Sequence, residues 1–277
     1  MAAQVSMKLL FHRRALFSPT TLFSIAGLVF GVASLVVAMS IMSGFEVTLS
    51  KALSDVTGHV RVYNRSTHLR DYKEVYSQLR QQESRIVSGA PFLVVEGVLS
   101  HHGRIGGIVF HGLGPSTGVD VLSIHSRLIE VEKWTEVGQL GVNEVYIGKG
   151  VAEQWGLRLN DRFKVVVPVP DDKSGGFSRH VSELQVKGIL DLGRYDWNQR
   201  TLMGNLETAQ KMSQIDSRQF FGLTLRLQEG RLAKEVSESL TERFKTYFDF
   251  QSWSDLNENL LRAVAFDRAV VFLVVIG

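Results

Sequence analysis

The feature that most constrains this chain is a run of 21 residues without a charge, from Leu22 to Met42. As an α-helix, a run of that length extends about 30 Å, which is the thickness of the hydrocarbon core of a bilayer. A soluble domain rarely contains so long an apolar run, so we expect residues 21–43 to form a transmembrane helix.

Basic residues stand before this run, at Lys8, His12, Arg13 and Arg14, and the first acidic residue of the chain, Glu46, follows it. Positive charge on one flank predicts that residues 1–20 stay in the cytoplasm and that the chain after the helix lies outside it. A cleaved signal peptide is the alternative, but its apolar core is normally about 7–15 residues long.

Small residues recur at steps of three and four along the helix and therefore share one face. They are Ser24, Gly27, Gly31, Ser34 and Ala38. Such a face lets another helix approach closely, so we expect it to pack against a partner helix.

Flexible and aromatic side chains lie at the outer end of the same helix, at Met39, Met42 and Phe45. Methionine adapts to irregular apolar partners. We interpret these three residues as candidate contacts for lipid or substrate, with bilayer-facing and helix-packing roles as the alternatives.

The chain ends in nine apolar residues, Ala269 to Gly277, which are too few to span a bilayer as a helix. A buried strand is one interpretation, because the segment is rich in β-branched residues. Upstream apolar residues at Leu260, Leu261, Val264 and Ala265 follow helical spacing without a breaker. We therefore expect residues 256–277 to be a connector and the truncated start of a second membrane helix.

Residues 46–255 alternate strand and helix patterns and predict an α+β domain. A strand at 59–64, a helix from Tyr72 and strands at 94–99 and 105–110, joined by a turn at His102 and Gly103, come first. A strand, helix and strand return at 220–250. Two such units can pair into a split βαβ, ferredoxin-like lobe.

The segment between these units, about 116–215, is predicted to be an inserted β-rich lobe. Its expected strands are 144–147, 163–167, 184–190 and 201–203, and its expected helices are 151–155 and 206–212. The predicted architecture is thus a two-lobed domain between two membrane helices.

Composition excludes several classes of function. A formal net charge of +3 without a basic cluster gives no case for nucleic acid, and the absence of cysteine excludes disulfides and cysteine-based zinc sites. Histidines at 101, 102, 111 and 125 lack a pattern of metal ligands, and we interpret them as surface residues. Gly148-Lys149-Gly150 lacks phosphate-loop spacing and predicts a strand-to-helix turn. We expect no catalytic site, no metal and no cofactor.

Four segments together resemble the permeases of the LolC/LolE type, which release lipoproteins and belong to the wider MacB-like and FtsX-like permease group. They are SIAGLVFGVASLVVAMSIMSGFE at 24–46, VYIGKGVAEQWGLRLNDRFKVVVP at 145–168, LQVKGIL at 184–190 and WSDLNENLLRAVAFDRAVVFLVV at 253–275. The resemblance covers nearly the whole chain, and none of the segments is a catalytic signature.

The resemblance implies the N-terminal half of a non-enzymatic permease of the bacterial inner membrane, with its main domain in the periplasm. It also implies four partners: a cytoplasmic ABC ATPase, a second permease subunit in a homo- or heterodimer, a lipoprotein substrate and a periplasmic lipoprotein carrier.

The segment 168–183 lies between two predicted strands and is long for a hairpin loop. In the resembling family a loop at this position in one subunit captures the carrier. Here the candidate carrier-binding residues are Pro168, Pro170, Lys173, Phe177 and Arg179. That subunit usually has a second proline near the far end of the loop, and this chain has none after Pro170, so which subunit it represents stays open.

Two other functions remain open from the sequence. One is a MacB- or FtsX-like permease that transduces motion for peptide export or cell-wall hydrolase control. The other is a membrane-anchored binding or sensor domain without a transport role.

Overall fold

The computed structural model describes residues 19–65, 71–114, 122–134, 137–171, 175–215 and 221–276. The chain divides into two compact units, which we treat separately. One contains helical residues within 1–48 and 258–277, and the other comprises residues 49–257.

The helical unit contains the predicted apolar helix. Helix α3 (Pro19–Thr57) is 39 residues long and continues well beyond the predicted transmembrane segment 21–43. Among the described residues it is the one helix that is long and apolar enough to cross a membrane, with a mean hydropathy of 2.4 in its most apolar window. The sequence prediction of a helix here is confirmed, although the helix is longer than predicted.

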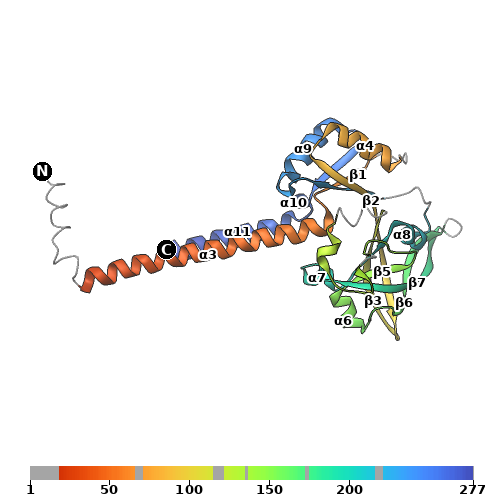
Figure 1. Cartoon of the computed structure of the whole chain (residues 1–277), viewed down its shortest axis with the longest axis horizontal. Helices are drawn as coiled ribbons and strands as arrows, with labels where there is room; N and C mark the ends of the chain where they lie inside the picture. Colours follow the sequence, from red (N-terminus) through yellow and green to blue (C-terminus); the bar gives the residue numbers. More distant parts are fainter. Residues whose placement is uncertain are drawn as a thin grey trace. The chain divides into compact units, whose positions relative to one another are not determined.

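The C-terminal segment is also helical, as helix α11 (Glu258–Ile276), so the alternative of a buried strand is wrong. Arg268 on α11 lies 3.3 Å from the carboxylate of Glu46 on α3. The two helices are therefore side by side at this level (Figure 1).

The larger unit begins and ends with two interleaved βαβ motifs. The first is β1 (Val60–Asn64), α4 (Tyr72–Gln82) and β2 (Ile86–His101), and the second is β9 (Gly222–Leu227), α9 (Ala233–Phe244) and β10 (Phe248–Ser252). The strands lie in the order β10-β1-β9-β2, and β9 pairs antiparallel with both β1 and β2. This is the split βαβ order that the sequence suggested.

Both helices of these motifs bury one apolar face. Val75 and Leu79 of α4 and Val236 and Leu240 of α9 pack with the inward residues of the sheet, Val60, Val62, Leu223 and Leu225. The 3.6-residue period of the helices and the two-residue period of the strands bring these side chains into one core.

The remaining strands extend the sheet from β2. They are β3 (Arg104–Leu113), β4 (Leu128–Val131), β5 (Glu144–Gly148), β6 (Arg162–Asp171), β7 (Gly176–Leu190) and β8 (Thr201–Asn205). Pairing runs from β2 through β3, β8, β5, β7 and β6 and returns to β2. These six strands therefore close into a barrel. Strand β2 belongs to both the barrel and the ferredoxin-like sheet.

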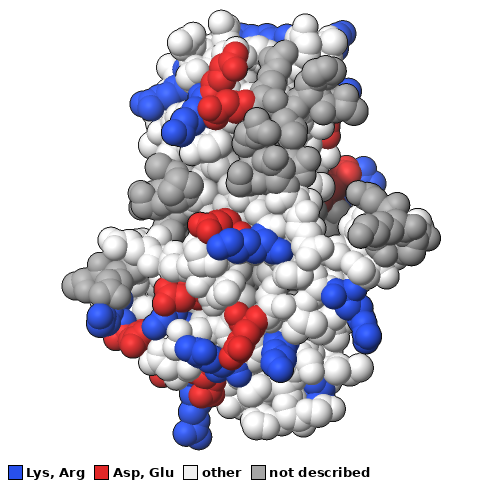
Figure 2. Space-filling view, turned by 90° about the vertical axis from the view of Figure 1, so that its right-hand side faces the viewer, with Lys and Arg blue, Asp and Glu red and all other residues white. Residues whose placement is uncertain are grey.

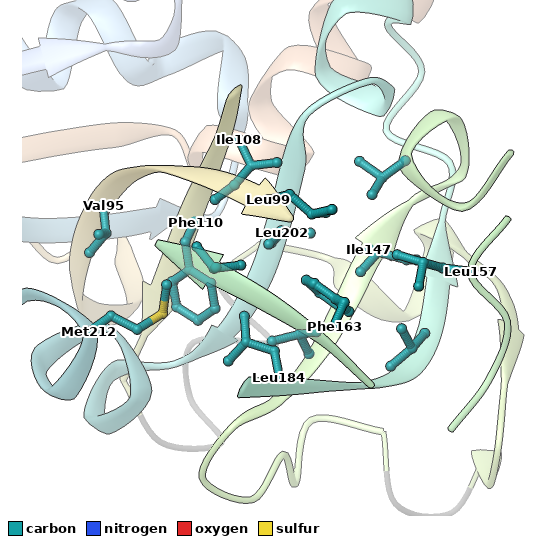
Figure 3. Packing of buried hydrophobic residues seen from close by; sticks show 14 of the residues in the cluster. Val95, Leu99, Ile108, Phe110, Ile147, Leu157, Phe163, Leu184, Leu202 and Met212 are labelled. Atoms are coloured by element: carbon teal, nitrogen blue, oxygen red, sulfur yellow. The ribbon is translucent and has the colours of Figure 1, made fainter. Parts of the chain in front are cut away.

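Apolar side chains fill the barrel. In Figure 3, Leu99, Phe110, Leu202, Phe163 and Leu184 point into a common interior from five strands. Helix α6 (Lys149–Trp155) contributes Val151, Ala152 and Trp155 to this core, and helix α8 (Leu206–Ser213) contributes Ala209 and Met212.

Short elements complete the unit. They are the 3-10 helices η1 (Ile124–Arg127) and η3 (Gly230–Leu232) and the helices α7 (Tyr195–Asn198) and α10 (Trp253–Leu256). The turn predicted between β2 and β3 is confirmed, since His102 and Gly103 have φ angles of 48° and 76° and join the paired residues His101 and Arg104.

The principal difference from the prediction concerns the inserted segment. Its strands join the same sheet as the ferredoxin-like lobe, through β2, and its closure into a barrel was not predicted. Residues 168–183 also differ, because most of them belong to the paired strands β6 and β7 rather than to a loop.

Candidate functional site

The candidate site is the outer part of the hairpin formed by β6 and β7. Strand β6 pairs with β2 only at Lys164–Val166, whereas its pairing with β7 continues to Asp171 and Gly176. Beyond Val166 the hairpin is thus a two-stranded ribbon, and Gly175 adopts a φ of +65° at its tip.

One face of the ribbon anchors it to the barrel core. Val167 and Val169 are buried in the same cluster as Met212 of α8. On β7, the side chain of His180 lies 2.9 Å from the amide nitrogen of Gln214, just after α8. The hairpin is therefore held firmly nearly to its tip.

The opposite face is open to solvent. Phe177 is 77% exposed and Val181, on the same side of β7, is 53% exposed. Pro168, Pro170 and Arg179 are exposed as well. An aromatic side chain presented on an anchored ribbon can enter a partner's apolar pocket with little loss of conformational entropy.

The two prolines lie on β6 opposite Arg179 and Phe177. Proline cannot donate a backbone hydrogen bond, and in sheets it is confined to edges. Pro168 and Pro170 therefore disfavour the addition of a further strand at this edge, and recognition here depends on side chains.

The structure thus brings Pro168, Pro170, Phe177 and Arg179 together, whereas Lys173 lies outside the described residues. Val181 was missed by the sequence analysis. Alternate residues of a strand share one face, so residues 177, 179 and 181 point to the same side of β7. This alternation indicates Val181 only if the segment is assigned to a strand.

The predicted packing face on α3 divides into two parts. Among the described residues, nothing lies within 4 Å of the position that a Cβ atom at Gly27 or Gly31 would take, and Ser24 and Ser34 are exposed. Ala38 is half-buried.

The predicted lipid-contact residues also differ in exposure. Met39 and Met42 are half-buried and share a helix stripe with Glu46, the partner of Arg268 on α11. Phe45 is 51% exposed. Packing toward α11 therefore competes with the lipid role at the two methionines.

The histidines do not gather into a metal site. Within the described ranges no group of three or more His, Asp or Glu side chains could hold a metal ion. His111 is half-buried rather than a surface residue as predicted, and burial lowers its pKa to about 3. His101 and His102 lie at the β2–β3 turn with ring centroids 4.0 Å apart.

The predicted strand-to-helix turn at Gly148-Lys149-Gly150 is confirmed, because β5 ends at Gly148 and α6 begins at Lys149. The Lys149 ammonium lies 2.6 Å from the carboxylate of Asp191, and this hydrogen bond lowers the pKa of Asp191 to about 2. The ion pair joins the turn to the end of β7. It gives Lys149 a structural role that needs no bound phosphate.

Surface charge is mixed. On the face in Figure 2, Lys and Arg are interspersed with Asp and Glu, and no broad area of one sign is visible among the coloured residues. This distribution gives no electrostatic case for binding nucleic acid on that face.

Comparison with known proteins identifies the class. Residues 21–243 match the family of the MacB-like periplasmic core domain. The match covers most of the apolar helix, the barrel and the ferredoxin-like motifs as far as α9, without β10, so the chain belongs to this family of permease domains. Its members are transporter subunits rather than catalytic ones.

Curated relatives include the lipoprotein-releasing system transmembrane protein LolC of Neisseria meningitidis serogroup B, which is 24% identical over 95% of this chain. LolC of Xylella fastidiosa is 22% identical over 94% of the chain, and LolE of Haemophilus influenzae is 21% identical over 92%. The chain spans only 61–62% of the length of these relatives. Such distant similarity supports membership of the wider MacB/FtsX-like permease group.

Among solved structures, the periplasmic region of MacB from Actinobacillus actinomycetemcomitans has a TM-score of 0.45 and 13% identity. That comparison covers 75% of this chain and 95% of the other. The extracellular domain of the ABC-type transporter YknZ from Gram-positive bacteria has a TM-score of 0.43 and 12% identity, covering 70% and 98%.

Proposed function

We propose that this chain is part of a permease subunit of an ABC transporter that releases lipoproteins from the inner membrane to a periplasmic carrier. The observation that carries the proposal is the exposed Phe177 on an anchored hairpin. It occurs in a chain whose similarity to LolC extends over 95% of its length.

The hairpin suits transient docking to a carrier. Its inner residues are buried, so the ribbon is preorganised, while Phe177 and Val181 present apolar surface on one side. Arg179 lies between them on the same side and would favour an acidic rim on the partner by steering the encounter.

The proposed location follows from the helices. Helix α3 would cross the inner membrane with residues 1–20 in the cytoplasm, so residues 46–255 would form the periplasmic domain and residues 256–277 would lead toward the membrane again. Hydrolysis of ATP would occur in a separate cytoplasmic ATPase, and a second permease subunit would complete the transporter. Phe45, exposed at the outer end of the apolar run, would meet lipid or the acyl chains of the lipoprotein.

A second candidate is a MacB- or FtsX-like permease that transduces motion for peptide export or for control of a cell-wall hydrolase. The match to the MacB-like periplasmic core domain favours it. The fold suits both functions, and the hairpin favours lipoprotein transfer.

Depletion of the gene that encodes this chain separates the two. Release of lipoproteins predicts that outer-membrane lipoproteins accumulate in the inner membrane of depleted cells, as measured by membrane fractionation and immunoblotting. Re-expression of the wild-type gene should restore their distribution. An unchanged lipoprotein distribution in depleted cells, with a defect in peptide export or cell separation, would contradict the proposal and support the alternative.

A further inference from the structure

The last turn of helix α3 makes a buried ion pair with the 3-10 helix η1. Nη2 of Arg127, the last residue of η1, lies 2.8 Å from Oδ2 of Asp55, and the two side chains are only 20% and 10% exposed. Among the described residues, Nε of Arg127 is buried without a hydrogen-bond partner. The carboxylate of Asp55 is thus the group that compensates this buried guanidinium.

The other end of η1 lines a cavity. Ile124, the first residue of η1, is 3% exposed. It forms the wall of a cavity of about 440 Å³ together with Leu113, Tyr146 and Met203. Ile124 and Arg127 are the first and last residues of this single four-residue turn, so we expect a displacement of Arg127 to reach Ile124.

Packing supports the same connection. Val56, next to Asp55 on α3, is buried in one cluster with Ile124, Tyr146 and Met203. These three residues also line the cavity. The end of α3 and the cavity wall therefore share both an ion pair and an apolar core.

We propose that the Asp55–Arg127 pair couples the last turn of helix α3 to the wall of this cavity through η1. Asp55 and Arg127 act as positioning residues. The inference concerns contacts within the domain and does not depend on the lipoprotein proposal.

A second anchor of α3 provides a matched control. Oγ1 of Thr224 donates a hydrogen bond of 2.9 Å to the backbone carbonyl of Thr57. This contact leads to β9, whose Arg226 donates a hydrogen bond to Oγ of Ser123 at the start of η1. The T224V substitution leaves that hydrogen bond and the Asp55–Arg127 pair in place. Loss of the Thr224 hydrogen bond should loosen the end of α3 without releasing Ile124.

The chain contains no cysteine, so one introduced thiol reports on one position. The I124C substitution places the reporter on the cavity wall. A separate A233C chain reports on a buried position of α9 that is 1% exposed and belongs to another cluster. The measurement is the rate of maleimide labelling of the full chain in detergent, with D55N, R127M or T224V added to each reporter.

The proposal predicts that D55N and R127M each accelerate labelling at I124C by about fivefold or more, the scale of coupling between contacting residues. Labelling at A233C should change less than about twofold, and T224V should leave I124C labelling near its starting rate. The double variant D55N/R127M should label no faster than the faster single variant, because both changes break one contact.

Three results would overturn the proposal. One is an unchanged rate at I124C in D55N, and another is an equal acceleration at I124C and A233C, which would indicate general destabilisation. The third is an effect of T224V on I124C as large as that of D55N.

Discussion

At the scale of single residues, His59 connects both ends of the larger unit to its sheet. Its Nδ1 accepts a hydrogen bond of 3.0 Å from the backbone N–H of Leu227, and its carbonyl accepts one of 3.0 Å from the N–H of Trp253. An imidazole that accepts at Nδ1 is neutral. Burial, reinforced by the positive charge of Arg226, lowers the pKa of His59 to about 4, while Asp55 acts in the opposite direction.

This environment makes stability depend on pH. The unfolded chain binds a proton at His59 near pH 6.5, whereas the folded chain does so only near pH 4. The contribution of neutral His59 to the free energy of unfolding is therefore complete above pH 6.5. As the pH falls toward 4, the free energy of unfolding decreases by up to about 3 kcal/mol.

The H59N substitution tests this expectation, because asparagine can accept the same hydrogen bond without titrating. Denaturant unfolding of the full chain at pH 7 and at pH 4.5 should show a smaller loss of stability in H59N than in the wild type. His111, whose pKa is also lowered, should leave some pH dependence in the variant. The same loss in both proteins would show that His59 is not responsible.

Some residue-level features were predictable because their causes are local. The turn at His102 and Gly103 and the strand-to-helix turn at Gly148 depend on a few adjacent residues. The pairing of Asp55 with Arg127 and the burial of His111 could not be predicted. They depend on contacts between segments that are far apart in the sequence.

At the scale of elements, the small-residue face of α3 is a packing surface that no described residue covers at Gly27 and Gly31. Among the described residues, nothing lies within 4 Å of the position of a Cβ atom at Gly27 or Gly31, so a side chain can begin at both positions without a clash. A defect in a G27L/G31L variant would therefore report a helix from outside the described residues.

We expect G27L/G31L to weaken assembly with partner helices by about 1–3 kcal/mol, the usual range for overpacking. The measurement is co-purification of the partner subunits with the protein from membranes. V29L/V36L is the matched control, because both valines are more than half exposed and lie on the other side of α3. Equal assembly of wild type and G27L/G31L would indicate that the small face contacts lipid alone.

The extent of several strands was underestimated for a physical reason. Glu96 and Ser100 point outward from β2, so the apolar pattern there appears broken although the strand continues to His101. Pro168 and Pro170 suggested a loop, yet both are compatible with β6 because the strand has no second neighbour at that point.

At the scale of the whole molecule, alternation of apolar and polar residues predicted the class of fold and the order of its elements. Closure of the barrel depends on the pairing of Val98 with Val166, 68 positions apart, and no local pattern encodes such a contact. The exposed face of the hairpin could not be predicted either, because the same pairing determines which side of β6 points inward.

Docking of a lipoprotein carrier to the hairpin of this permease domain is tested most directly by titration of the full chain with the purified periplasmic carrier. F177A should weaken binding by about 1–3 kcal/mol, because an exposed aromatic anchor can dominate a small interface. Y195A is the matched control, since Tyr195 is 80% exposed on α7, and it should bind like the wild type. Equal affinity of F177A and the wild type for the carrier would show that the hairpin does not dock the carrier through Phe177.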